Sequence, residues 1–144
     1  MGVALTACTV PHVGRPGFEL ADDEVEIGIG IHGEPGRHRV TASGAHDITQ
    51  RLLEPVVEDL GLTAGEQVLL FVNGMGGTPL SELYVVYGRA REMLAERGVE
   101  VTRSLVGSLV TSLEMQGASV TVLRLDAELT ELWDAPVRTP ALRW

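Results

Sequence analysis

The run Gln67-Val68-Leu69-Leu70-Phe71-Val72, continued by Asn73-Gly74-Met75-Gly76-Gly77-Thr78-Pro79, decides the fold of this 144-residue chain. A short, continuous apolar run is typical of a central strand that is covered on both faces, or nearly so. In the second part, Thr78 is a suitable N-cap and Pro79 suits the first turn of a following helix. That helix ends at Gly98 and carries one apolar stripe, made of Leu80, Leu83, Tyr84, Tyr87, Ala90 and Leu94. The sequence therefore predicts a strand, a glycine-rich loop and an amphipathic helix.

Two more strands are predicted downstream of this unit. Residues 99–106 have the pattern of a strand, and because a helix links them to residues 67–72, the two strands are expected to be parallel. Residues 119–125 predict a further strand that is partly buried. The intervening segment, 107–115, is ambiguous between a loop, a strand and a short helix.

The C-terminal residues predict a short helix and an extended tail. Asp126 can cap a helix that runs through Trp133. The tail, 134–144, contains two prolines and is expected to be extended. Trp144 must therefore pack on another part of the chain if it is ordered.

The N-terminal part predicts two strands and a loop. Residues 2–10 have the pattern of a buried strand. Residues 24–31 alternate, which places one apolar face on Val25, Ile27, Ile29 and Ile31. The opposite face of that strand carries carboxylates and then glycines, so it leaves room for another group to lie against it. Residues 37–46 are polar and are expected to form an exposed loop.

A helix is predicted from Ile48 to Leu60, with Asp47 as its N-cap and Gly61 as its stop. Pro55 conflicts with an uninterrupted helix, because an interior proline removes a hydrogen bond, and it predicts a kink or two short pieces. Together the elements predict one α/β domain over residues 1–144. Its expected fold is a two-layer mixed β-sheet with helices packed on it, including one strand–Gly loop–helix–strand crossover.

The composition excludes several classes of protein. The chain has 11 arginines, no lysine, 20 acidic residues and a formal net charge of -9, so neither nucleic acid nor an anionic membrane is an expected partner. No apolar run is long enough to span a bilayer, and the N-terminus lacks the layout of a signal peptide, which makes a cytoplasmic protein the expectation. The single cysteine, Cys8, excludes an intrachain disulfide and is expected to pack as a small buried residue.

Two glycine-rich segments have features of nucleotide-binding sites. Gly28-x-Gly30-x-x-Gly33 matches the dinucleotide fingerprint, but a loop follows it where that motif needs a helix. The Asn73–Pro79 segment does lie between a strand and a helix, yet the lysine of a phosphate-binding loop is missing. It is either a tight turn or a loop that lines a pocket or contacts a partner, and the residues available for that role are Asn73, Gly74, Gly76 and Gly77.

His32, in the turn after residues 24–31, is the main candidate for chemistry. A metal site is not expected, because His32, Glu34 and His38 lack the second spaced pair of ligands that zinc sites require. A histidine has a neutral form at physiological pH that can act as a base or nucleophile. The residues alone leave two readings open: a functional histidine in a glycine-walled pocket, or a histidine that merely closes a turn.

Five segments, in order along the chain, resemble the dihydroxyacetone kinase family, and specifically the second half of its substrate-binding subunit. They are Gly2–Pro11, Glu26–Gly36, Asn73–Tyr84, Thr111–Met115 and Leu132–Trp144. The resemblance implies that His32 holds dihydroxyacetone covalently as a hemiaminal, with Gly30, Gly33 and Glu34 as substrate-binding residues. It also implies that a terminal hydroxyl of the held ketose is then phosphorylated to dihydroxyacetone phosphate.

The same resemblance implies partners. ATP or ADP and magnesium are expected on a separate helical kinase subunit or domain, with no cofactor in this chain, and a homodimer is expected. The family's preceding half, which carries a glycine-rich segment and an aspartate of the pocket, is not in this chain, so the isolated chain is expected to be inactive. The alternative is a non-catalytic module that binds a ketose, regulates, or docks on a kinase partner; a nucleotide-binding protein is a weaker third reading.

Overall fold

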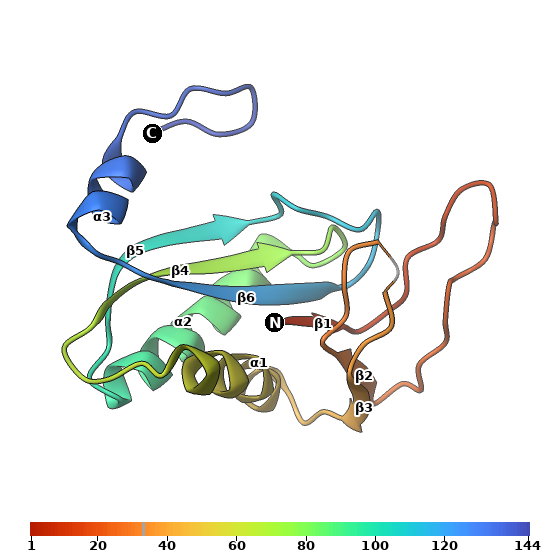
Figure 1. Ribbon diagram of the computed structural model, residues 1–144. Coiled ribbons are helices and arrows are strands. Elements are labelled where there is room, and N and C mark those ends of the chain that lie inside the picture. The colour runs from red at the N-terminus through yellow and green to blue at the C-terminus, as the bar shows by residue number, and fades with distance from the viewer. Residues whose placement is uncertain (33) are drawn as a thin grey trace.

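One six-stranded mixed sheet with helices on one face organises the molecule, as the computed structural model of residues 1–32 and 34–144 shows (Figure 1). The elements in chain order are β1 (Gly2–Ala4), β2 (Glu24–Ile27), β3 (His38–Thr41), α1 (Ala45–Leu60), β4 (Gln67–Gly74), α2 (Leu80–Glu96), β5 (Glu100–Gly107), β6 (Gly117–Arg124) and α3 (Ala127–Asp134). The strand order is β3-β2-β1-β6-β4-β5. Strands β4 and β5 are parallel, and the other pairs are antiparallel.

The unit β4–α2–β5 confirms the predicted strand, glycine loop, helix and parallel strand. β4 lies between β5 and β6, and Val68, Leu70 and Val72 on it are fully buried. These three side chains pack with apolar residues of α1 and α2, both of which lie on the same side of the sheet in Figure 1. This layer between sheet and helices is the main core.

The two faces of the sheet differ. Leu69, on the face away from α1 and α2, is only 4% exposed, whereas Leu123 beside it is 41% exposed. Phe71, also on this face, is half-buried. β4 is therefore nearly covered on both faces, as predicted, with the helices on one of them.

The predicted first strand, 2–10, is too long. β1 ends at Ala4, because the amides of Leu5 and Thr6 both donate to the carbonyl of Gln116, at 2.7 and 3.2 Å, and the chain turns there. The strand predicted over 24–31 is also shorter, since β2 ends at Ile27 and Gly28 takes a φ of 81°.

Residues 37–46 were expected to be a loop, and this prediction is wrong for His38–Thr41. These residues form β3, an edge strand that pairs antiparallel with β2. Arg39 on β3 lies 3.7 Å from a carboxylate oxygen of Glu24 and 3.4 Å from one of Glu26. Polar side chains are normal on an edge strand, which is why the composition of this segment concealed it.

Helix α1 is continuous through Pro55, so the prediction of two short pieces is wrong. Leu52, Leu53 and Val57 on either side of the proline are buried against the sheet, and this packing outweighs the local cost of the proline. The helix also begins earlier than expected, at Ala45, so that Asp47 lies in its first turn rather than at the N-cap. The predicted stop is confirmed, because Gly61 has a left-handed conformation with φ 59°.

The C-terminal tail packs on the helix that precedes it. Asp126 caps α3 as predicted, accepting from the amide of Leu129 at 2.8 Å. Trp144 stacks on Trp133 with the ring centroids 4.9 Å apart. α3 itself has no buried residue, and in Figure 1 it stands beyond one end of the sheet. Among residues 1–32 and 34–144 there is no helix with the length and apolar character needed to cross a bilayer.

Candidate functional site

His32 lies at a hollow of about 460 Å³ that is built by loops at one end of the sheet. Four short stretches of the chain form it, and the residues that line it are Ala7, Cys8, Val10, Gly17, Phe18, Ile31, His32, Thr111, Ser112, Leu113 and Met115. We call this the His32 hollow. Its walls are mainly apolar, with the hydroxyls of Thr111 and Ser112 and the thiol of Cys8 as polar groups besides the imidazole. Small polar molecules are bound in such sites by a few polar groups set in an apolar wall.

Glu34 holds one edge of the His32 side chain. Its carboxylate accepts the backbone amide of His32 at 2.8 Å, and its Oε1 lies 3.3 Å from Nδ1 of the imidazole. Hydrogen bonds from its own backbone amide and then from that of His32 lower the pKa of Glu34, so it is ionised at neutral pH. A carboxylate at Nδ1 favours the tautomer that carries the proton on that nitrogen, and this leaves the Nε2 lone pair available.

Side chains of the same turn fill the space beside its glycines Gly28 and Gly30. A Cβ on Gly30 would collide with the Glu34 carboxylate, and one on Gly28 would meet the Arg37 side chain at 2.5 Å. The room predicted beside the glycines is therefore occupied from within, and Gly30 lets Glu34 reach His32. Gly33, the other predicted substrate-binding glycine, lies outside the described residues.

A buried carboxylate supports the base of the turn. Glu26 is only 7% exposed, and its Oε1 accepts the amide of Gly36 at 2.6 Å. Arg39, which pairs with Glu26, also lies over the ring of Phe18 with its guanidinium carbon 5.8 Å from the centroid. Since Phe18 lines the His32 hollow, Arg39 connects the turn to one wall of the site. The sequence did not single out Glu26 or Arg39, because the edge strand that brings them together was not expected.

The loop at 73–77, predicted to line a pocket or contact a partner, does not line the His32 hollow. None of Asn73, Gly74 and Gly76 lines the His32 hollow, and Gly77 lines a different one beside the start of α2. Asn73 is 2% exposed and hydrogen bonds to residues 109–110 instead. Thr78 does not cap α2 as expected, because its hydroxyl bonds to the backbone of Gly117.

Glu114 links two of the segments that line the His32 hollow, the one with Cys8 and the one with Met115. The amide of Thr9 donates to its carboxylate at 2.7 Å, and the amide of Gln116 donates to the hydroxyl of Thr6 at 3.0 Å. These two bonds join the segment that carries Cys8 to the segment that carries Met115.

We predict that acid loosens this wall. Hydrogen bonds from its own backbone amide and then from Thr9 lower the pKa of Glu114. Because the folded pKa is depressed, the stabilisation is fully present above the ordinary glutamate pKa of about 4.3 and is lost as pH falls through the depressed value. Hydrogen exchange at the Thr9 amide, corrected for its intrinsic pH dependence, should show protection at neutral pH that disappears in acid. In Glu114→Gln this acid-dependent change should vanish, and its persistence would contradict the assignment.

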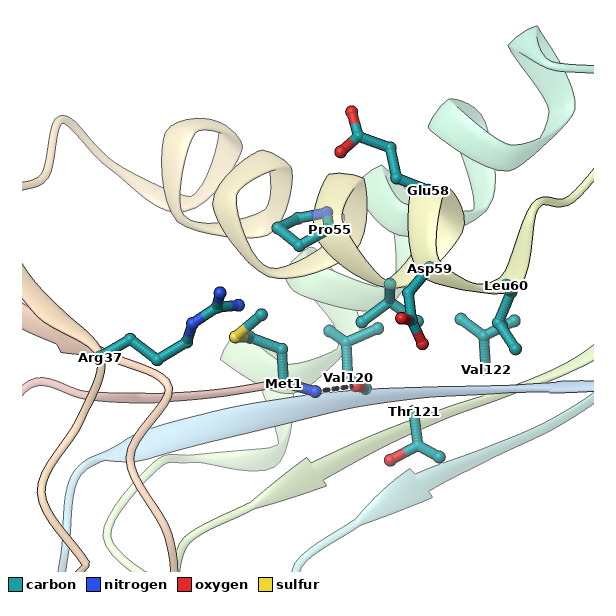
Figure 2. A pocket seen from close by; sticks show the side chains of 10 residues that line it. Met1, Arg37, Pro55, Glu58, Asp59, Leu60, Val120, Thr121 and Val122 are labelled. Carbon is teal, nitrogen blue, oxygen red and sulfur yellow. Dashed lines mark hydrogen bonds between the residues drawn. The ribbon is translucent and has the colours of Figure 1, made fainter.

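A larger hollow, of about 660 Å³, lies beside the C-terminal half of α1 (Figure 2). Figure 2 shows the Met1 amino group donating to the carbonyl of Val120, at 2.7 Å, with Arg37 on one side and Asp59 on the other. Its lining has no histidine, cysteine or serine, so the His32 hollow is the better candidate for chemistry. Within residues 1–32 and 34–144, no three histidine, cysteine or acidic side chains are grouped as metal ligands would be.

Comparison with known proteins gives a consistent family. The model of the Dak1 domain matches residues 1–141. The chain is 49% identical over 142 residues to the dihydroxyacetone-binding subunit DhaK of PTS-dependent dihydroxyacetone kinase 1 from Listeria innocua, covering 98% of this chain and 43% of that protein. It is 39% identical over 147 residues to L-erythrulose kinase from Pectobacterium atrosepticum, covering 99% of this chain and 25% of that enzyme.

A solved structure agrees. The dihydroxyacetone kinase operon co-activator DhaQ superposes with a TM-score of 0.87 at 35% identity, over 94% of this chain and 42% of that protein. The chain thus spans less than half the length of each of these three relatives.

Proposed function

The chain belongs to the Dak1 domain family, and from that membership we propose that residues 1–144 form the ketose-binding C-terminal domain of a dihydroxyacetone kinase substrate subunit, with His32 as covalent anchor. One observation carries the proposal: His32 lies at the hollow with Nδ1 beside the Glu34 carboxylate, which leaves Nε2 for attack on a carbonyl. The names of the relatives support dihydroxyacetone and erythrulose as the class of substrate.

The proposed addition balances without an outside reagent. The Nε2 lone pair attacks the carbonyl carbon, a C–N bond forms, and the π electrons move to the oxygen. The proton on Nδ1 passes to the Glu34 carboxylate, and Glu34 then returns one proton, through solvent, to the alkoxide oxygen, so the carboxylate is restored, the product is a neutral hemiaminal and no group leaves. Glycerol, which has no carbonyl, cannot form this bond. The chemistry of the site therefore admits short ketoses and aldehydes and rejects polyols.

The exposure of His32 supports the proposal that another part of the subunit completes the site. The His32 side chain is 80% exposed, whereas an anchor for a small ketose needs walls that enclose the substrate. We assign the remaining walls to the preceding half of the subunit, since relatives of this chain are more than twice as long. Gly30, Gly33 and Glu34 remain proposed substrate-binding residues, as the family resemblance implies.

The phosphoryl group would come from elsewhere in a cytoplasmic assembly. This chain has no lysine to contact a phosphate, so we place ATP or ADP and magnesium on a helical donor subunit or domain. A phosphotransfer relay is the other possible source, as the PTS-dependent relative suggests. We include a homodimer in the proposal because the helix-free face of the sheet exposes Leu123 beside the half-buried Phe71. Light scattering of the complete subunit tests this part.

The direct test uses dihydroxyacetone labelled isotopically at its carbonyl carbon. Mixed with the complete subunit, the labelled carbon should move from the ketone region of the spectrum to that of a tetrahedral carbon, and labelled glycerol should show no change. A ketone signal that stays unshifted at saturating protein would overturn the covalent assignment.

We predict that the isolated 144-residue chain does not phosphorylate dihydroxyacetone, even with donor subunit and ATP. The reason is that its site lacks the enclosing half. A coupled assay for dihydroxyacetone phosphate measures this, with the complete subunit as the positive control. Turnover by the isolated chain near the rate of the complete subunit would contradict the prediction.

A regulatory role is the second candidate, favoured by the TM-score of 0.87 to the operon co-activator. A regulator of this kind would bind the ketose without passing it to a donor subunit. The two candidates are separated by one comparison. A kinase subunit consumes the bound ketose when donor subunit and phosphoryl source are added, and a regulator leaves it unchanged.

A further inference from the structure

The proposed function assigns no role to the loop at 73–77, although its first residue is buried and fully hydrogen-bonded. Asn73, the only asparagine in the chain, sits near the end of β4 and is 2% exposed. Its amide nitrogen donates to the carbonyl of Val110 at 2.7 Å, and its Oδ1 accepts the amides of Leu109 and Val110 at 3.0 and 2.9 Å. The amide nitrogen and the amide oxygen of this buried side chain thus both form hydrogen bonds with the backbone of two successive residues.

The glycines after Asn73 extend the contact. The amide of Ser112 donates to the carbonyl of Met75 at 2.7 Å, and the amide of Gly77 donates to the carbonyl of Met115 at 2.9 Å. Gly76 has a φ of 125°, and a Cβ there would collide with the carbonyl oxygen of Leu113. Residues 109–115, which we call the strip, therefore lie directly on the backbone of the Asn73–Gly77 loop.

The strip supplies one wall of the His32 hollow. Thr111, Ser112, Leu113 and Met115 all line it. Leu113 has a φ of 53°, the only positive value among non-glycine residues of the described chain, and its side chain is 53% exposed. A large side chain in the left-handed region persists only where the surrounding bonds hold the backbone in place. Those bonds come from Asn73 and the glycines.

We propose that Asn73 is a positioning residue for the ketose site: through the strip it sets how far the wall of Leu113 stands from His32, and thereby which length of ketose fits. The inference rests on the proposed function for its substrate class, three-carbon and four-carbon ketoses. Asn73 itself touches no substrate. Its effect passes through two backbone amides and one carbonyl, which lose their partners when the side chain is removed.

The test compares Asn73→Ala with Gln67→Ala, a matched change at the other, exposed end of β4, in the complete subunit. Affinities for dihydroxyacetone and erythrulose are measured by calorimetry. Asn73→Ala should bind dihydroxyacetone about tenfold to a hundredfold more weakly and should change the ratio of the two affinities, since small misplacements at a site have effects of this size. Asn73→Asp keeps the acceptor for both amides and should restore part of the affinity. Gln67→Ala should change neither value.

A second readout needs no ketose. Cys8, the only cysteine, lines the same hollow and is half-buried, so its alkylation by a thiol reagent reports on the opening of the wall. Alkylation should be several times faster in Asn73→Ala and unchanged in Gln67→Ala. If Asn73→Ala does not fold, Asn73→Asp takes its place, because it keeps the acceptor for the two amides and loses only the donor to the Val110 carbonyl; its ratio of affinities should shift and its alkylation should be faster than in the unaltered protein.

The outcomes separate the two proposals. If the unaltered subunit binds neither ketose, the proposed function fails, and the alkylation rates still decide whether Asn73 holds the wall. If the folded variants keep both the ratio of affinities and the alkylation rate of the unaltered protein, the inference about Asn73 is overturned.

Discussion

Replacing His32 with alanine in the complete subunit should abolish the covalent ketose adduct and reduce ketose phosphorylation by roughly a thousandfold or more, the loss typical for removal of a covalent nucleophile. His32 supplies the only imidazole among the residues that line the hollow. The variant should still fold, because the side chain is 80% exposed and contributes little to the core. The shift of the labelled carbonyl carbon measures the adduct, and a phosphorylation assay measures the rate.

Two further variants make this prediction specific. His46→Ala, at an exposed position on α1 outside the hollow, should leave adduct and rate unchanged. Glu34→Gln keeps an acceptor near Nδ1 but loses the charge that stabilises the proton released there, so it should have a smaller effect than His32→Ala. An adduct of undiminished yield in His32→Ala would remove this residue from its assigned role.

Replacing Leu70 with alanine should lower the free energy of unfolding by about 2–5 kcal/mol. Leu70 is fully buried on β4, between Ser104 of β5 and Val122 of β6 in the register, and it faces α1 and α2. Because total stability of such a domain is about 5–15 kcal/mol, this one side chain accounts for a large share of it. Urea unfolding followed by far-ultraviolet circular dichroism measures the change.

Leu123→Ala is the matched control. The residue is on the neighbouring strand but on the helix-free face, where it is 41% exposed, so its truncation should cost less than about 1 kcal/mol in the isolated chain. Equal losses for the two leucines would mean that both faces of the sheet are equally buried in solution. That result would contradict the two-layer arrangement and point to association through the helix-free face.

The central part of the fold could be predicted because its signals are local. The apolar run through Leu70, the glycine loop and the helix after it are each visible in a few successive residues. The predicted apolar stripe of that helix is wrong at Leu80 and Tyr84, which are both more than half exposed. The segment containing Arg39 could not be recognised, since an edge strand is defined by its pairing with β2 and not by its own composition. Pro55 misled for a related reason: its local cost is visible in the sequence, whereas the packing of Leu53 that offsets it depends on the tertiary fold.

The candidate site follows the same division. His32 stands out in the sequence because a titratable residue in a glycine-rich turn is unusual, and the resemblance to a family supplied its chemistry. Glu26 and Arg39 support that turn from distant positions and carry no motif of their own. The sequence predicts a role for Asn73 in lining a pocket or contacting a partner. Its bonds to residues 109–110, more than thirty positions later, depend on tertiary contacts that no local pattern encodes.

The stacking of Trp133 on Trp144 has a practical consequence. These are the only two tryptophans in the chain, and both belong to a helix and tail in which α3 buries no residue. Tryptophan fluorescence should therefore report the detachment of the tail at a lower denaturant concentration than the one that unfolds the sheet. A midpoint from tryptophan fluorescence would describe the end of the chain and would give no information on the unfolding of the core around Leu70.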